Sequence, residues 1–286
     1  MTAPAVSPLP IVADVHIHTK HSHGLGSVAE MLAAARKAGL QIIGFSEHSP
    51  RPEGFGYAKD YQASLLSTYP DYVQEVCAFR DDLAPLGVQV LLGTEFDYIA
   101  SREDFAREFC SAYPYDYVLG GLHFQGPWGF DATADEWADL SEEARFAVYS
   151  RYYQDMTGMC DCGLFNVVAH PDLVKIFTRP SFDTWLEDAG SMALVRQAFT
   201  AAKDNGMVME ISSAGLRKPC KEIYPGPRLM EIARDVQLGI SFGSDAHCTN
   251  TPAFAFDQLA RYATAYGFTH SLVFVQGSPK QVPIAV

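Results

Sequence analysis

The chain has 286 residues, of which 48% are hydrophobic, enough for a large core in one α/β barrel or in two smaller domains. Its formal net charge of −13 argues against nucleic-acid binding, because such proteins usually present a basic face to the phosphates. No apolar run is long enough to cross a membrane, and residues 1–10 form an Ala/Pro-rich lead without the apolar core of a signal peptide. We expect a cytoplasmic protein with neither a nucleic-acid nor a membrane partner.

Strand-like and helix-like segments alternate along the whole chain. Apolar runs predict strands at residues 11–17, 41–45, 88–92, 115–119, 164–168, 207–211 and 238–242, with a weaker eighth run at 271–275. Helices are expected between them, at residues 27–38, 61–83, 142–159, 189–205, 227–236 and 252–266.

This alternation, with short connections, favours right-handed βαβ units and a parallel sheet. Seven or eight such repeats suit closure into an α/β barrel like the TIM barrel. The alternative is an open doubly wound sheet, but no Gly-rich phosphate fingerprint follows the first strand. Because no linker or internal repeat interrupts the pattern, we expect one domain over residues 1–286.

The first strand ends in Asp14-Val-His16-Ile-His18, and His21 and His23 follow in the next loop. Alternate side chains of a strand share a face, so Asp14, His16 and His18 should point to the same side. A lone histidine on an apolar strand is usually a hydrogen-bonded core residue, but four imidazoles within eight residues are hard to explain by packing. We interpret them as metal ligands.

Polar residues also follow each later strand of the predicted barrel. They are His48, Glu95, His123, His170, Glu210, Asp245 and His247. In a parallel barrel the carboxyl ends of the strands lie on one rim, where catalytic groups collect. Glu95 and Asp245 could instead be helix caps or surface carboxylates. Each directly follows an apolar strand beside other candidate ligands, however, which favours metal binding.

Six short motifs together resemble those of a known family. They are D-x-H-x-H (14–18), S-E-H (46–48), G-T-E-F-D (93–97), G-L-H-F (121–124), A-H-P-D (169–172) and G-S-D-A-H (243–247). This set is similar to that of the polymerase and histidinol phosphatase (PHP) superfamily, and the similarity covers nearly the whole chain. The longer segments 121–131, 169–177 and 212–225 look most like the histidinol-phosphate phosphatase branch.

The resemblance implies a distorted (β/α)7 barrel with three divalent metal ions at the C-terminal rim of its strands. The first ion would be bound by His16, His18, Glu95 and Asp245. Glu95 would bridge to a second ion, which would also be bound by His123 and His170. The ligands of the third ion would be His23, His48 and His247.

Two assignments near the first strand have alternatives. His21 could replace His23, because both occupy the loop after His18, although the spacing favours His23. Asp14 lies deeper on the strand, and we expect it to orient an imidazole through the second ring nitrogen. Alternatively, Asp14 is a buried carboxylate paired with an arginine or lysine.

Three divalent ions and two carboxylates would leave a charge of about +4 with neutral imidazoles, which suits a phosphate monoester dianion. Two close metal ions can lower the pKa of bound water and clamp the attacking and leaving oxygens. We expect Glu95 to bridge two ions, and Asp245 or His247 to protonate the leaving group.

Substrate contacts are expected from residues that follow the sixth strand. Arg217 and Lys218 could bind the phosphate, the first through its planar guanidinium and the second as a point charge. Alternatively, Arg217 and Lys218 are solvated side chains of a loop that do not contact the substrate. Glu210 is a candidate for binding a substrate amine.

The predicted activity is hydrolysis of a small phosphate monoester, first of all L-histidinol phosphate to L-histidinol and phosphate in histidine biosynthesis. Alternatives are a related phosphoesterase acting on nucleotides or another small phosphate, and an amidohydrolase-like metal-dependent hydrolase. A noncatalytic metal-binding subunit is disfavoured because the predicted ligand set is complete. Histidine and carboxylate ligands suit Zn, Mn and Fe alike, and the sequence does not indicate an oligomeric state.

Overall fold

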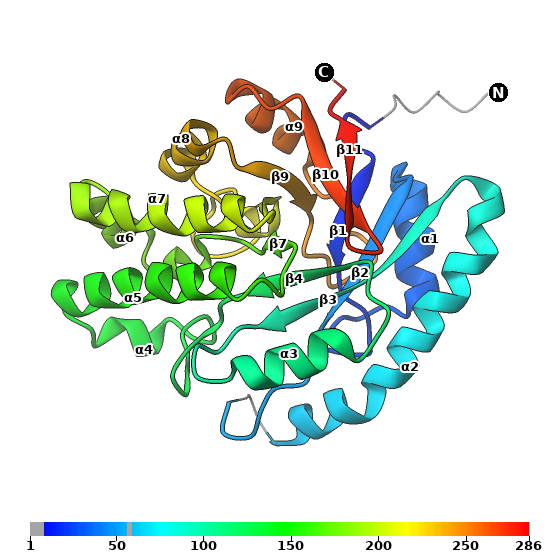
Figure 1. The fold of residues 1–286 in the computed structure, drawn as a ribbon, viewed down its shortest axis with the longest axis horizontal. Helices are drawn as coiled ribbons and strands as arrows, with labels where there is room; N and C mark the ends of the chain where they lie inside the picture. The colour runs from blue at the N-terminus through cyan, green and yellow to red at the C-terminus, as the bar shows by residue number, and fades with distance from the viewer. Residues whose placement is uncertain (1–8, 56–58, 286) are drawn as a thin grey trace.

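Seven parallel strands form one sheet in the order β1-β2-β3-β4-β7-β8-β9 (Figure 1). The computed structural model describes residues 9–55 and 59–285, so most of the predicted N-terminal lead lies outside the described residues. The strand bounds are Ala13–Ile17 (β1), Ile42–His48 (β2), Gln89–Asp97 (β3), Tyr117–Gly121 (β4), Val167–Val168 (β7), Val208–Ser212 (β8) and Gly239–Gly243 (β9). A parallel bridge between Ile17 and Ala246 brings the edge strands together. The predicted distorted (β/α)7 barrel is therefore confirmed.

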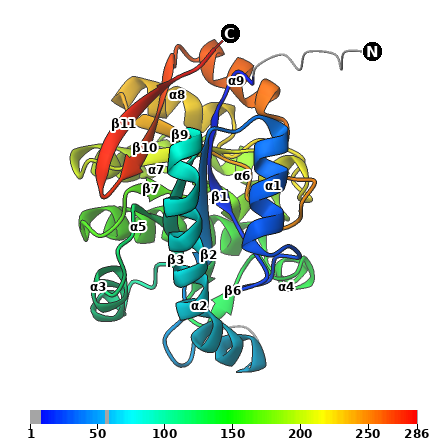
Figure 2. The same cartoon turned by 90° about the vertical axis from the view of Figure 1, so that its right-hand side faces the viewer.

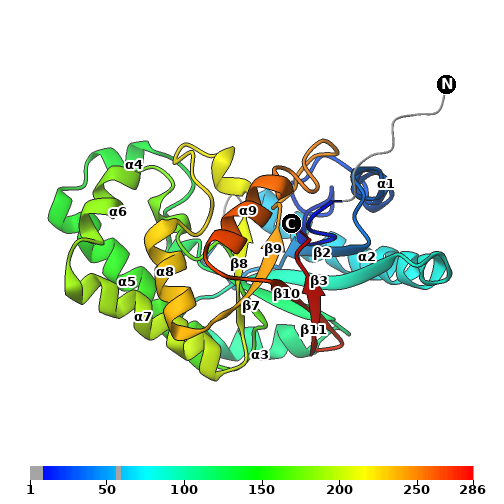
Figure 3. The ribbon, with the colours of Figure 1, turned by 90° about the horizontal axis from the view of Figure 1, so that it is seen from above.

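Helices cover the outside of the barrel. Their bounds are Val28–Ala38 (α1), Lys59–Leu83 (α2), Glu103–Ser111 (α3), Asp135–Ala138 (α4), Glu142–Asp161 (α5), Arg179–Trp185 (α6), Ala189–Asp204 (α7), Pro227–Val236 (α8) and Phe256–Ala265 (α9). Figures 1 and 3 show α4 to α8 gathered on one side of the strands and α1 and α2 on the other. Among the described residues, no helix is both long enough and apolar enough to cross a membrane.

Local sequence signals determine where several helices begin and end. Ser27 and Glu30 form a reciprocal capping box at the start of α1, and Gly39 ends that helix in the left-handed conformation. Helix α9 begins four residues later than predicted. Ala253 and Ala255 have φ of 58° and 55°, and residues in this left-handed region cannot belong to a right-handed helix.

The eighth predicted strand is present but lies outside the barrel sheet. It is β10 (His270–Val275), which pairs antiparallel with β11 (Ser278–Pro283). Val273 and Phe274 of this hairpin belong to the apolar cluster that fills the barrel interior, together with Ala13 and Leu91 near the start of their strands. The hairpin therefore closes the amino-terminal end of the barrel, and Figure 2 shows it at the end of the molecule opposite β6 (Trp128–Gly129).

Candidate metal-binding site

The carboxylate of Glu95 lies at the centre of the histidine cluster. Its Oε2 is 3.2 Å from Nε2 of His16 and 3.3 Å from Nε2 of His18. Asp245 approaches the same point from beyond β9, with Oδ1 3.7 Å from Nε2 of His16 and 3.4 Å from Nε2 of His18. The four residues predicted to bind the first ion thus meet at one point on the carboxyl rim.

The second oxygen of Glu95 faces a different pair of imidazoles. Its Oε1 is 2.8 Å from Nε2 of His170 and 3.4 Å from Nε2 of His123. Because β3, β4 and β7 are neighbours in the sheet, their ends bring these three side chains together. One carboxylate therefore lies between two groups of ligand atoms, as a bridging residue must.

A third compact group contains His18, His48 and His247. The group predicted from the sequence for the third ion has His23 in place of His18. The ring of His23 lies 4.9 Å from that of His48 and 4.2 Å from that of His247, so His23 borders the group from its exposed side. Nε2 of His21 instead lies 2.8 Å from Glu75, which places His21 outside the cluster and favours the choice of His23.

Several buried nitrogens in this cluster have no hydrogen-bond partner within the described residues. They are Nε2 of His16, both ring nitrogens of His18, Nδ1 of His48, Nδ1 of His170 and Nε2 of His247. Buried polar atoms are normally paired, because leaving them unpaired costs free energy. Nε2 of His16 and Nε2 of His18 face the carboxylates of Glu95 and Asp245. Imidazole nitrogens beside carboxylates are the donor set that Zn²⁺ and similar ions bind, so these residues fit divalent metal ions.

The predicted ligands fall into two groups by their pKa. The neighbouring carboxylates outweigh burial and raise the pKa of His16, His18 and His123, so metal binding at these three rings would release protons. Burial and the neighbouring His18 lower the pKa of His23 to about 4 and that of His247 to about 3, so both rings are neutral near pH 7, as a ligand must be. Burial alone would raise the pKa of Glu95 and Asp245, but the surrounding histidines hold both pKa values well below the usual range.

Three buried acids support the cluster from behind. Oε1 of Glu210 is 2.7 Å from Nδ1 of His16, while its Oε2 accepts a hydrogen bond from the backbone N–H of His170 at 2.7 Å. Asp97 pairs with Nδ1 of His123, and Glu47 lies 3.6 Å from Nδ1 of His18. Carboxylates behind metal-binding histidines fix the ring orientation and the tautomer.

The position of Glu210 corrects one sequence prediction. Glu210 is fully buried, and both of its oxygens are engaged below the cluster. It therefore lies too deep to bind a substrate amine. Sequence reasoning gave no role to Asp97 or Glu47, although both stand inside the G-T-E-F-D and S-E-H motifs, where a second acid beside a ligand was the available signal.

Asp14 also has a different role from the predicted one. Its Oδ1 accepts hydrogen bonds from the backbone of His16 at 3.3 Å and of Ser244 at 2.9 Å, and its Oδ2 accepts one from Ala253 at 3.0 Å. The pairing of β1 with β2 is irregular between Asp14 and Ile17, and such irregularities break strict alternation. Asp14 therefore ties β1 to the segment after β9 and orients no imidazole.

The backbone is strained at two of the predicted ligands. His170 has φ 25° and Asp245 has φ 51°, in a region that costs non-glycine residues free energy and often marks functional sites. Gly243 precedes Asp245 by two residues, and a Cβ at Gly243 would overlap Glu210 and His16. Glycine is therefore required here for β9 to pass close to the cluster.

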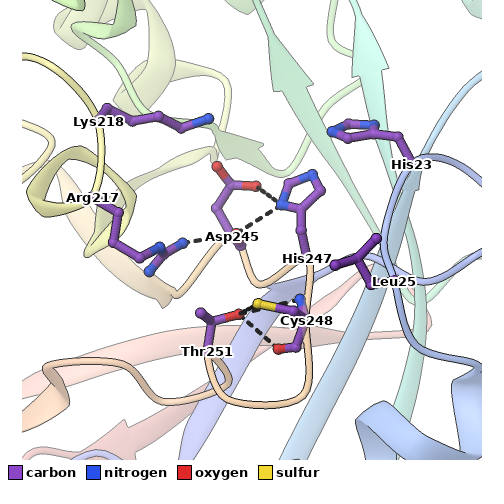
Figure 4. A pocket seen from close by; sticks show the side chains of 8 residues that line it. All are labelled: His23, Leu25, Arg217, Lys218, Asp245, His247, Cys248 and Thr251. Atoms are coloured by element: carbon purple, nitrogen blue, oxygen red, sulfur yellow. Dashed lines mark hydrogen bonds and ion pairs between the residues drawn. The ribbon is translucent and has the colours of Figure 1, made fainter.

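Two cavities open onto the cluster. The inner one, of about 70 Å³, is lined by His23, His48, Glu95, His123, Asp131, His170, Leu173, Lys218, Asp245 and His247. The outer one, of about 440 Å³, is lined by His23, Leu25, Arg217, Lys218, Asp245, His247, Cys248 and Thr251 (Figure 4). Lys218 lines both cavities, and its ammonium forms no hydrogen bond or salt bridge within the described part of the chain.

Arg217 lies at the outer cavity but is partly engaged by the protein. Its Nη2 donates hydrogen bonds to the carbonyls of Ser244 at 2.7 Å and Asp245 at 3.0 Å, and its guanidinium stacks over Phe254 at 5.0 Å. Arg217 therefore holds the segment that carries Asp245, and Lys218 is the freer cation.

Comparison with known proteins places these observations in a family. Residues 14–214 match the model of the PHP domain. The chain is 31% identical over 246 residues to the "probable histidinol-phosphatase" of Deinococcus radiodurans, covering 86% of this chain and 90% of that protein. It is 27% identical to the histidinol-phosphatase of Bacillus subtilis, with 85% and 96% of the two chains covered.

A solved structure shares the same fold. It is the Lactococcus lactis histidinol phosphate phosphatase in complex with zinc, L-histidinol and phosphate, which superimposes with a TM-score of 0.74. The superposition covers 94% of this chain and 98% of that one, at 16% sequence identity.

Proposed function

Since the chain belongs to the PHP domain family, we propose that it hydrolyses a small phosphate monoester, L-histidinol phosphate, to L-histidinol and phosphate. The observation that carries this proposal is the position of Glu95 between two groups of histidines, beneath a cavity that Lys218 borders. Its relatives in Deinococcus radiodurans and Bacillus subtilis carry the histidinol-phosphatase name, which supports this substrate over other phosphate esters.

The proposed site holds divalent metal ions, three in number, on the ligands predicted from the sequence. Such ions, when bound, activate water for attack and neutralise phosphate oxygens. The Lactococcus lactis structure contains zinc, but at 16% identity it indicates the fold alone. Zinc, manganese and iron all stay candidates for this chain.

The protein's own residues perform the remaining tasks. Lys218 places a positive charge at the boundary of the two cavities, where it can bind a phosphate oxygen as a point charge. Asp245 and His247 line both cavities as well, so either is placed to take the proton released by the attacking water and pass it to the leaving alkoxide. Glu210 and Asp97 hold His16 and His123 in fixed orientations, which keeps the ligand cluster preorganised.

We further propose that residues 1–286 form one catalytic domain that acts in the cytoplasm on a small molecule. The outer cavity of about 440 Å³ can accommodate the imidazole and propyl parts of the substrate. The inner cavity of about 70 Å³, which the predicted metal ligands line, is where we expect the phosphate group. A phosphodiester would need space for a second substituent there.

Metal analysis of the purified protein, combined with kinetics on a panel of phosphate esters, tests this function. We expect bound divalent metal and a kcat/KM for L-histidinol phosphate well above that for nucleotide monophosphates and for phosphodiesters. A preference for nucleotides would replace the substrate but retain the phosphatase class. Turnover of amides or lactones instead of phosphates would overturn the class.

A further inference from the structure

Asp131 is a pocket carboxylate that neither the ligand set nor the supporting acids include. Three carboxylates line the inner cavity, and the other two, Glu95 and Asp245, belong to the predicted metal ligands. Oδ1 of Asp131 is buried and has no hydrogen-bond partner within the described residues. A buried carboxylate oxygen without a partner is costly unless a ligand supplies a donor.

The fold brings Asp131 to this position through a short hairpin. Strands β5 (Phe124–Gln125) and β6 pair antiparallel directly after β4, and Phe130 donates a backbone hydrogen bond to the carbonyl of His123 at 3.2 Å. The chain therefore returns to the end of β4 one residue before Asp131. The side chain of Phe130 is fully buried, and Trp137 donates a hydrogen bond to the Phe130 carbonyl at 2.6 Å, which anchors the turn.

The unpaired oxygen of Asp131 can accept a hydrogen bond from a cationic ligand. Burial raises the pKa of Asp131, and Asp97 raises it as well, whereas His123, Arg51 and Lys218 lower it. Within the described residues no donor reaches Oδ1. A ligand ammonium at hydrogen-bond distance would supply that donor and stabilise the ionised carboxylate.

The proposed substrate carries such a group at a suitable place. In L-histidinol phosphate the ammonium sits on the carbon next to the phosphorylated carbon, so it must lie within a few ångströms of the phosphate. The inner cavity of about 70 Å³ holds both Asp131 and the predicted phosphate site, whereas the imidazole requires the outer cavity of about 440 Å³. Asp131 lines the inner cavity but not the outer one, which favours contact with the ammonium and not with the imidazole.

We propose that Asp131 binds the α-ammonium of the substrate and makes the enzyme selective for phosphate esters of 2-amino alcohols. This inference rests on the proposed function and deepens it. It gives the role first expected of Glu210 to a residue that lines the cavity, while Glu210 remains below the ligand cluster.

The test uses pairs of ligands that differ only in the amine. One pair is L-histidinol phosphate and its des-amino analogue, and the other is 2-aminobutyl phosphate and butyl phosphate. The metal-loaded wild type should prefer the amino member of each pair. Asp131→Asn should lower kcat/KM for the amino members by roughly 10- to 150-fold, the range expected for one charged hydrogen bond, and leave the des-amino members within about twofold.

Binding of the free alcohols provides a second readout that needs no turnover. Ligand-observed NMR titration gives dissociation constants for L-histidinol and its des-amino analogue, even in the millimolar range. Asp131→Asn should weaken L-histidinol alone. Asp131→Glu, which keeps the charge, should retain part of the preference. Asp135→Asn, at an exposed position in the same segment, should behave as wild type.

Each outcome decides between the possible roles. An equal loss on both members of a pair, an unchanged amine preference, or loss of bound metal from Asp131→Asn would each overturn the ammonium subsite. If the amine preference holds for the butyl pair but L-histidinol phosphate is a poor substrate, the subsite stands and the proposed substrate is wrong. If no phosphate ester is hydrolysed, the phosphatase function fails and the NMR titration alone decides on Asp131.

Discussion

Oε1 of Glu210 lies 2.7 Å from Nδ1 of His16, and both side chains are fully buried. With Nδ1 engaged, the opposite nitrogen of the ring is directed at Glu95, 3.2 Å away. The same Glu210 accepts a hydrogen bond from the backbone of His170, so one buried acid orients ligands of both halves of the Glu95 bridge.

Replacing Glu210 should therefore weaken metal binding. Glu210→Ala should lower metal affinity by roughly 10- to 100-fold, as is usual for residues that orient metal ligands. The metal affinity of Glu210→Gln should lie between that of Glu210→Ala and that of the wild type. Competition with a chelator measures this, and Glu231→Ala, at a partly exposed position on α8, serves as the control. Equal affinity of Glu210→Ala and wild type would show that His16 needs no such support.

Removing the bridge itself should have the largest effect. Glu95→Gln should lose metal and nearly all turnover. In the proposed site the negative charge of Glu95 offsets the repulsion between two cations, and the variant lacks that charge. The barrel should stay folded, since its apolar interior lies elsewhere. Elemental analysis and circular dichroism check the two halves of this prediction, and normal metal content with a normal rate would contradict the bridging role.

His21 and His23 offer a matched pair within one loop. His23 packs over the rings of His48 and His247, whereas His21 pairs with Glu75 outside the cluster. His23→Ala should therefore lose part of the bound metal and lower kcat/KM by at least about tenfold, while His21→Ala should change neither by more than about twofold. The reverse ranking of the two variants would assign the ligand role to His21.

The sequence was sufficient to predict the barrel, because its strands and helices follow from simple periodicities. Parallel strands end on one rim, so residues directly after each apolar run, such as Glu95 and His170, could be brought together without coordinates. The register irregularity in β1 could not be predicted in this way, because it depends on the pairing of β1 with β2. This irregularity separates Asp14 from the imidazoles of its own strand.

The supporting acids escaped sequence reasoning for a related reason. Asp97 ends β3 and Glu210 lies in the middle of β8. Only the closure of the barrel determines which acid faces a cavity and which lies behind a histidine. Asp131 was missed because it follows a hairpin of two-residue strands, too short to give a periodic signal.

A buried ion network should dominate the stability of the loops around the site. Nζ of Lys175, which is fully buried, lies 2.5 Å from Asp172 and 2.6 Å from Glu222, and thereby joins the loop after β7 to the loop after β8. Lys175→Met should lower the free energy of unfolding by roughly 3–5 kcal/mol, because it leaves the buried Asp172 without its cation. Glu222 keeps a second cation, Arg179, at 2.9 Å.

Urea unfolding of this variant measures the effect, with Lys203→Met on the exposed side of α7 as the matched control. Combining Lys175→Met with Asp172→Asn and Glu222→Gln should recover part of the loss, since no unpaired charge then remains in the interior. If the triple variant is less stable than Lys175→Met alone, the penalty does not come from uncompensated charge.

Lys218 and Arg217 should separate substrate binding from loop support. Lys218 borders both cavities, and its charge lowers the pKa of Asp131 and Asp245. Lys218→Met should therefore raise KM for phosphate monoesters at least about tenfold, the loss expected for one charged contact, with metal content unchanged. Arg217 donates to the carbonyls of Ser244 and Asp245, so Arg217→Ala should loosen the segment that carries Asp245 and lower kcat. Steady-state kinetics with metal analysis distinguishes the two roles. Lys218→Arg, which keeps the charge, should have a KM closer to wild type than Lys218→Met. Arg217→Lys should restore little of the activity lost in Arg217→Ala, because an ammonium cannot reproduce the stacked, forked contact of a guanidinium. A loss of metal in Lys218→Met with KM unchanged would move this lysine from the substrate to the support of the ligand cluster.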